Sequence, residues 1–167
     1  SSLGFKSGNV YAGNKVSVFG TDNRLRIQSD ATLQTDNLVL AEGGTLELSG
    51  EIIGDIVNWG GSIDIGGIDI ARGDIDGNLN LAGNNKDRVL PSEIIFDIYG
   101  NSPGFGHDFL SVGQTVDLTD VTITLRYNWA PPDNQVFDLI ESGEGITGTP
   151  KIMSYSGLSS YYACEWI

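Results

Sequence analysis

Apolar residues recur at every second position along this chain, and glycine pairs interrupt the alternation at short intervals. The stretch GGTLELSGEIIGDIVNWGGSIDIGG, residues 43–67, shows both features, as in Leu46-Glu47-Leu48 and Ile63-Asp64-Ile65. A period of two belongs to β-strands whose side chains point alternately to the core and to solvent, whereas a helix needs a period of 3.6. Because Gly-Gly marks turns, the pattern predicts short strands joined by tight corners.

Four stretches share one pattern, in which two polar or glycine residues precede an apolar–polar–apolar triplet. The first apolar residues of these stretches are Leu25, Leu46, Ile63 and Leu79. Further short strands are expected between them, at residues 37–40, 55–57 and 68–70. One triplet cannot bury its aliphatic side chains alone, but stacked coils can, because like residues then align in columns. Outward positions would carry the polar residues Arg26, Glu47, Asp64, Asp69 and Asn80.

We therefore predict an all-β chain, built as a parallel β-solenoid over residues 1–85. Longer strands are expected after residue 85, at residues 92–99, 108–112, 115–118, 121–127 and 135–140. Residues 86–150 are expected to form wider coils or a β-sandwich-like cap, with longer antiparallel strands as the other arrangement. Residues 151–167 form an aromatic tail, in which Tyr161, Tyr162 and Trp166 could dock on a neighbouring subunit.

The charge balance excludes several classes of partner. The chain of 167 residues has 22 Asp and Glu but only nine Lys and Arg, which gives a net charge of −13. Nucleic acids would be repelled, since binding them depends on cations that neutralise phosphates. No apolar run is long enough for a membrane-spanning helix. The single cysteine, Cys164, excludes an intrachain disulfide.

The second half of the chain resembles a known family. Gly106-His107-Asp108-Phe109-Leu110-Ser111-Val112 is similar to the G-x-D-x-L-x-V signature of bacterial autotransporter passenger domains. Two further stretches are similar to flanking motifs of that family. They are residues 70–81, which end in Gly77-Asn78-Leu79-Asn80-Leu81, and residues 136–148. The resemblance therefore covers about residues 68–150. It implies a right-handed parallel β-helix, secreted or displayed on a surface, without a shared catalytic residue. Similar stretches occur in viral and phage fibres.

A group of acidic residues suggests a metal site, although a simpler interpretation also exists. Asp64, Asp69, Asp74 and Asp76 lie close together in the sequence. Ca²⁺ takes six to eight oxygen ligands, so these carboxylates are candidates to bind it. The simpler interpretation is that they are solvated side chains on outward positions and that the protein has no cofactor.

A ligand face is predicted from aromatic and acidic residues together. Trp59 and Trp129 could stack on the faces of sugar rings, beside Asp64 and Asp69; the alternative for the tryptophans is core or cap packing. Paired carboxylates on neighbouring strands could also cleave a polysaccharide. The single histidine, His107, and its neighbour Asp108 are expected at a turn, with Asp108 bound to turn backbone.

The functional expectation is a non-enzymatic, secreted or surface-displayed module of adhesin or scaffold type. Its partners would be surface glycans or other copies of itself. The first alternative is a structural or receptor-binding fibre component of a virion or phage, which would be a homotrimer. The second alternative is a polysaccharide lyase or hydrolase.

Overall fold

The computed structural model describes residues 1–81, 90–156 and 164–167, and these form one curled sheet of parallel strands. The described residues contain strands and turns but no helix, as the sequence predicts. It follows that none of them forms a helix of the length and apolar character that crossing a membrane requires. All ladders between the described strands are parallel, including those of the second half, so the alternative of longer antiparallel strands is wrong.

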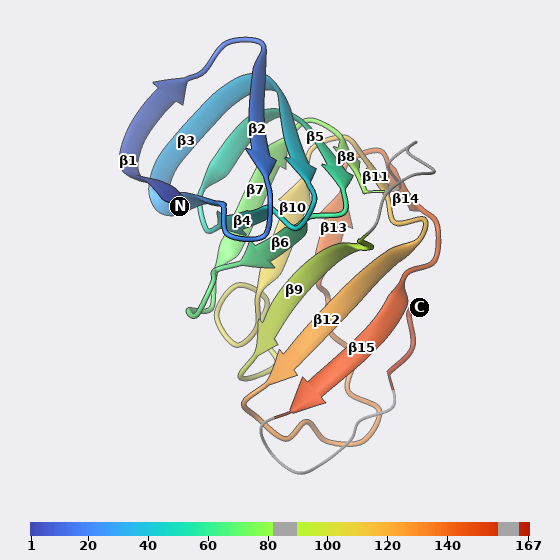
Figure 1. Ribbon diagram of the computed structural model, residues 1–167. Helices are drawn as coiled ribbons and strands as arrows, with labels where there is room; N and C mark the ends of the chain where they lie inside the picture. The colour runs from blue at the N-terminus through green and yellow to red at the C-terminus, as the bar shows by residue number, and fades with distance from the viewer. Residues whose placement is uncertain (82–89, 157–163) are drawn as a thin grey trace.

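The strands pair in three ladders. Ladder A runs through the start of β1 (Ser2–Tyr11), the start of β3 (Arg24–Ala41), β4 (Thr45–Leu48), β6 (Ser62–Ile65), β9 (Ser92–Ile98), β12 (Val121–Tyr127) and β15 (Lys151–Ser156). In Figure 1, β9, β12 and β15 lie side by side at one end of the molecule, and β1 and β2 lie at the other.

Ladders B and C are built from the strands that follow those of ladder A. Ladder B runs through the rest of β1, the middle of β3, the start of β5 (Glu51–Trp59), β7 (Arg72–Asp76), β10 (Phe109–Val112) and β13 (Ile140–Ser142). Ladder C runs through β2 (Lys15–Phe19), the ends of β3 and β5, β8 (Leu79–Asn80), β11 (Thr115–Asp117) and β14 (Gly145–Thr147). The chain thus visits A, B and C in turn, and then returns to A.

Each ladder carries a column of buried aliphatic side chains in register. The column of ladder A is Leu25, Leu46, Ile63, Ile94 and Ile123. The column of ladder B is Leu33, Ile52, Ile75 and Val112. The column of ladder C is Leu38, Ile56, Leu79 and Val116. The three columns meet in one core, and each buried side chain contributes about 1.5–3 kcal/mol.

Three predictions about strands are wrong. Leu79 lies in ladder C, and the column of Leu25, Leu46 and Ile63 continues at Ile94 instead. Residues 68–70 form no strand, because Gly66 and Gly67 turn the chain with φ of 76° and 74°. Residues 135–139 form no strand either, and β13 begins only at Ile140. Strands β9 to β12 lie within about a residue of the ranges that the sequence predicts.

Two corners of the sheet differ in the length of their loops. The corner between ladders A and B holds residues 49–50, then 66–71, 99–108 and 128–139, so its loops lengthen along the chain. The corner between ladders B and C stays tight and carries a stack of glycines. A Cβ on Gly77 would lie 2.2 Å from the Gly54 carbonyl oxygen, and one on Gly143 would lie 2.2 Å from the Gly113 oxygen. Only glycine allows this approach of successive turns.

Candidate functional site

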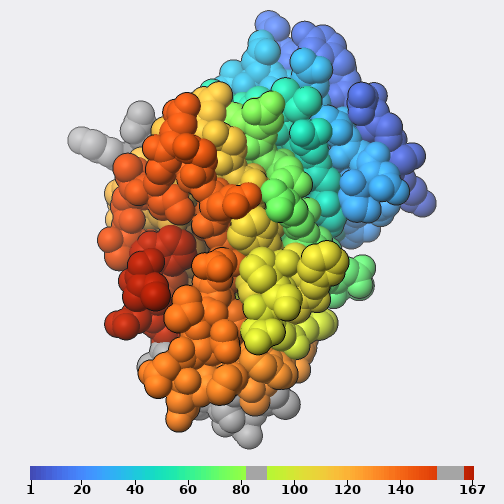
Figure 2. All heavy atoms as spheres, turned by 180° about the vertical axis from the view of Figure 1, so that it is seen from behind, coloured from blue at the N-terminus to red at the C-terminus, as the bar shows by residue number. Residues whose placement is uncertain are grey.

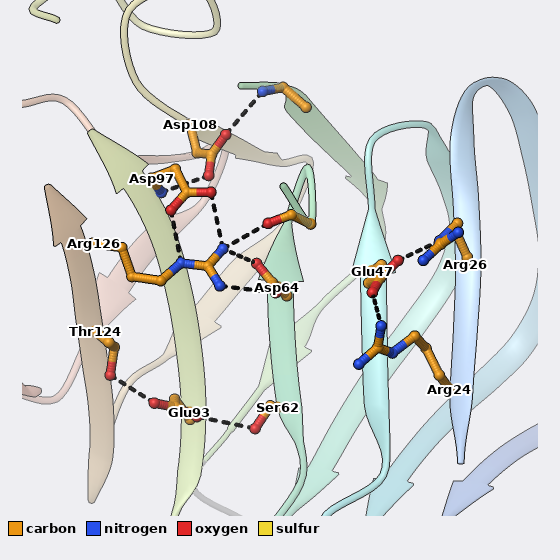
Figure 3. Close-up of polar contacts among 12 residues, drawn as sticks. Arg24, Arg26, Glu47, Ser62, Asp64, Glu93, Asp97, Asp108, Thr124 and Arg126 are labelled. Carbon is orange, nitrogen blue, oxygen red and sulfur yellow. Dashed lines mark hydrogen bonds and ion pairs between the residues drawn. The ribbon is translucent and has the colours of Figure 1, made fainter. Parts of the chain in front are cut away.

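A network of charged side chains lies on the outward face of ladder A, with Arg126 at its centre (Figure 3). The Arg126 guanidinium on β12 donates to both oxygens of Asp97 on β9, at 2.7 and 2.9 Å. It also reaches Asp64 on β6 at 2.8 Å and the Gly67 carbonyl at 2.6 Å. The turn at Gly66 and Gly67 presents that carbonyl. One side chain therefore ties three neighbouring strands together.

Asp108 joins this network to the corner between ladders A and B. Its two carboxylate oxygens accept hydrogen bonds from the backbone N–H groups of Ala71, at 2.8 Å, and Asp97, at 2.6 Å. Asp108 thus bonds backbone N–H groups, as the sequence predicts, but these belong to the loop of residues 66–71 and to β9 and not to its own turn. Asp108 is fully buried and lies at the end of the loop of residues 99–108. It fixes the position of that loop against the loop of residues 66–71.

Burial shifts the pKa values of these carboxyl groups upward. It raises the pKa of Asp108 to about 8, although the two backbone N–H groups oppose the shift. It raises the pKa of Asp64 to about 6 against the attraction of Arg126, with the charges of Asp97 and Glu47 adding to the increase. The pKa of Asp97 is also raised by burial, again against its bonds with Arg126. Burial in the folded state therefore makes each of these carboxyls easier to protonate than it is in the unfolded chain.

A second set of contacts extends the network along ladder A. Glu47 on β4 is buried and forms ion pairs with Arg24 and Arg26 on β3. Glu93 on β9 accepts hydrogen bonds from the hydroxyls of Ser62, at 3.1 Å, and Thr124, at 2.6 Å. Polar side chains on this face thus bond mainly to the neighbouring strands. The sequence prediction that Glu47 points into solvent is wrong, because the two arginines cover it.

These carboxylates are poorly placed for chemistry on a substrate. A glycosidase needs two accessible carboxyls on either side of the scissile bond. The Asp97 side chain is only 5% exposed and Asp64 only 13%, and both are engaged by Arg126. Asp108 is closed off from solvent altogether. The network can hold strands together and respond to pH, but it offers no open acid pair.

The structure separates the four aspartates that the sequence groups as candidate Ca²⁺ ligands. Asp64 lies on ladder A, whereas Asp74 and Asp76 lie on β7 in ladder B. Asp69 is exposed in the turn between them, and Asp74 pairs with Arg72 at 2.9 Å. In the described ranges, no group of three or more His, Cys, Asp or Glu side chains is placed to hold a metal ion. Ca²⁺ binding stays a prediction.

The predicted aromatic ligands also lie apart. Trp59 ends β5 and is 37% exposed. Trp129 is half-buried and packs edge-on against Phe137, which in turn contacts His107. His107 is buried, with its ring nitrogens 3.2 Å from the Gly100 carbonyl and 3.0 Å from the Asp138 carbonyl. Trp166 of the tail packs against the core, whereas Tyr161 and Tyr162 lie outside the described residues.

A shallow depression of about 430 Å³ lies where the loop of residues 99–108 meets ladder B. It is lined by Arg72, Pro103, Gly104, Phe105, Phe109, Asp138, Ile140 and Glu141. The loop bulges from the face that Figure 2 shows, where its yellow residues lie between green and orange ones. Sequence reasoning missed this site and missed Arg126. The available signals were an isolated phenylalanine in a Pro-Gly loop and an arginine on an outward strand position of an acidic chain.

No protein-family model, curated protein or solved structure matches the chain. The resemblance to autotransporter passenger domains therefore stays a prediction.

Proposed function

We propose that the chain is a right-handed parallel β-solenoid and that it acts as a non-enzymatic scaffold or adhesin module, secreted or displayed on a cell surface. Ladders A, B and C would be the three sides of its coils. A right hand is expected because parallel crossover connections in one sheet are almost always right-handed. Its partners would be surface glycans or further copies of the chain.

The observation that carries this proposal is the register of the buried columns. Leu25, Leu46, Ile63, Ile94 and Ile123 pair one after another along ladder A, and ladders B and C repeat the arrangement. Each coil thus depends on its neighbours for burial, which makes a stack stiff along its axis. Stiffness is what a scaffold needs in order to hold a binding face away from its anchor.

The state of the acidic residues in and beside ladder A supports a role without catalysis. Arg126 engages Asp64 and Asp97, backbone N–H groups engage Asp108, and two arginines engage Glu47. An enzyme that cleaved polysaccharide would leave such groups accessible to its substrate. In this molecule they link strands to one another.

Binding and turnover on polysaccharides test the proposal together. The purified chain is immobilised on beads and incubated with neutral and acidic polysaccharides, and retained glycan, new reducing ends and unsaturated products are measured. We expect retention of at least one glycan and no cleavage. Cleavage that disappears in Asp64→Asn or Asp69→Asn would instead establish a lyase or hydrolase. Absence of both retention and cleavage would refute the glycan-binding role.

A second candidate function is a fibre component of a virion or phage that associates with copies of itself. The N-terminal coil favours it, because β1 and β2 each pair on one side only and leave Leu3, Tyr11 and Phe19 exposed. Unpaired strand edges with apolar side chains are sites of association. Light scattering on the purified chain separates the two functions, since a fibre component is expected as a trimer and a passenger-type scaffold as a monomer.

A further inference from the structure

We propose that the depression beside the loop of residues 99–108 binds a neutral sugar residue of a glycan. It deepens the scaffold function proposed above and rests on it, because a glycan-binding scaffold needs a place where the glycan is held. The site would use Phe105 as a stacking platform, with Asp138 and Glu141 as hydrogen-bond acceptors and Arg72 as the donor. These residues come from three consecutive strands of ladder B and their loops.

Phe105 stands in solvent on a well-braced loop. Its side chain is 89% exposed, although an apolar ring gains free energy from burial. Gly106 N–H donates to the Ser102 carbonyl at 2.6 Å, Gly104 N–H donates to the His107 carbonyl at 2.7 Å, and Tyr99 N–H donates to the Gly106 carbonyl at 2.7 Å. Since Asp108 also fixes the end of the loop, the backbone that carries Phe105 is ordered before any ligand arrives, which lowers the entropic cost of binding.

The polar wall of the depression is also held in position. The buried ring of His107 contacts the carbonyl of Asp138 at 3.0 Å, so the loop of residues 128–139 is fixed against the loop that carries Phe105. Asp138 itself is exposed. Arg72 lies 5.2 Å from the centre of the Phe109 ring and bonds Asp74 and Glu141. The guanidinium has five N–H donors, so it retains donors for a ligand.

The charges select the class of ligand. Asp74, Asp138 and Glu141 surround the single cation Arg72, so an anionic sugar such as a uronate would be repelled. A neutral pyranose has an apolar ring face for Phe105 and hydroxyls that both donate and accept. The volume of about 430 Å³ lies within the usual range for small-ligand sites.

Amide NMR spectra of the full chain test this site directly. The probes are cellotetraose, maltotetraose and chitotetraose, with tetragalacturonate as the acidic counterpart. We expect at least one neutral probe to shift signals within residues 99–110 and 138–141, and tetragalacturonate to shift none. Phe105→Ala should weaken binding about 10-fold, because stacking on one aromatic ring is worth roughly that factor. Asp138→Asn should weaken it about 10-fold through loss of a charged acceptor.

The matched control is Phe19→Ala, which removes another exposed phenylalanine, on β2 of ladder C, and should leave binding unchanged. The site is refuted if no neutral probe binds, if tetragalacturonate binds more tightly, or if Phe105→Ala binds as the unmodified chain does. Shifts confined to another region would refute the site and leave the scaffold function standing. Shortened oligosaccharides in the same spectra would refute the non-enzymatic function itself.

Discussion

Replacing Arg126 with methionine tests whether one guanidinium offsets the buried negative charge on ladder A. Methionine keeps an apolar stem and removes the cation and its donors. The variant leaves Asp97 and Asp64 with side chains 5% and 13% exposed and without their ion-pair partner. Removing one partner of a buried pair costs about 3–5 kcal/mol. Because Arg126 is itself 32% exposed, we expect the lower end, about 3 kcal/mol at pH 7.5.

The loss should depend on pH in a definite direction. Without the cation, the folded-state pKa values of Asp64 and Asp97 rise further above the unfolded value of about 4. Between the unfolded and folded pKa values, the folded state binds more protons than the unfolded state, so its stability falls as pH rises. The deficit of the variant relative to the unmodified chain should therefore shrink to about 1 kcal/mol at pH 4.5.

Urea unfolding followed by tryptophan fluorescence at both pH values gives these free energies. Arg72→Met is the matched control, since Arg72 also pairs with two carboxylates. Its side chain is 52% exposed, however, and those of Asp74 and Glu141 are 41% and 56% exposed. Exposed pairs contribute about 0–1 kcal/mol. Equal deficits at pH 4.5 and 7.5, or a loss no larger than that of Arg72→Met, would refute the electrostatic explanation.

Four other substitutions, one of them a control, test separate parts of the structure by urea unfolding. Burial raises the pKa of Asp108 to about 8, so the folded state holds an extra proton between about pH 4 and 8. Asp108→Asn removes this proton uptake, so its stability relative to the unmodified chain should rise with pH across that range, by up to about 1.4 kcal/mol per pH unit, and a constant difference would contradict this. Gly66→Ala should cost well over 1 kcal/mol, since its Cβ would lie 1.9 Å from the Asp69 carbonyl oxygen. Gly8→Ala, with positive φ but open space, should cost only about 1 kcal/mol, and equal losses would rule out the steric argument. Leu46→Ala should cost about 2–5 kcal/mol through a cavity in the column of ladder A, and a loss below 1 kcal/mol would show that the column is not tightly packed.

The sequence predicts the strands of this fold better than their partners. The alternation of apolar residues identifies Leu25, Leu46 and Ile63, which do share a column. The same pattern at Leu79 leads to the wrong ladder, because all three ladders carry the same period of two. Which ladder a strand joins depends on its place in the order A, B, C: β7 follows β6 into ladder B, and β8, which holds Leu79, follows β7 into ladder C. A local pattern of apolar residues does not show which ladder a strand joins.

The charged network could be predicted only in part. An aspartate after a turn indicates bonding to backbone N–H groups, but the groups that Asp108 bonds, on Ala71 and Asp97, are 37 and 11 residues away in sequence. Arg126 and Asp64 are 62 residues apart in sequence, and they meet only because β6, β9 and β12 are adjacent in one register. Burial of Glu47 has the same origin, since it depends on two arginines of the preceding strand. Contacts of this kind depend on the register between neighbouring strands. That register is set by the whole fold and not by the local sequence.

The corner between ladders A and B should tolerate insertions, whereas the glycine corner between ladders B and C should not. Lengthening a loop adds little entropic cost by itself, and the corner between ladders A and B already accommodates segments from 49–50 up to 128–139. Foreign peptides grafted near residue 102 should therefore leave the ladders intact and be presented to solvent. The glycine corner has no such freedom, since each backbone there touches the next turn at Gly77 and Gly143. Of these two corners, only the one between ladders A and B therefore leaves room for a varied surface, whether evolved or engineered.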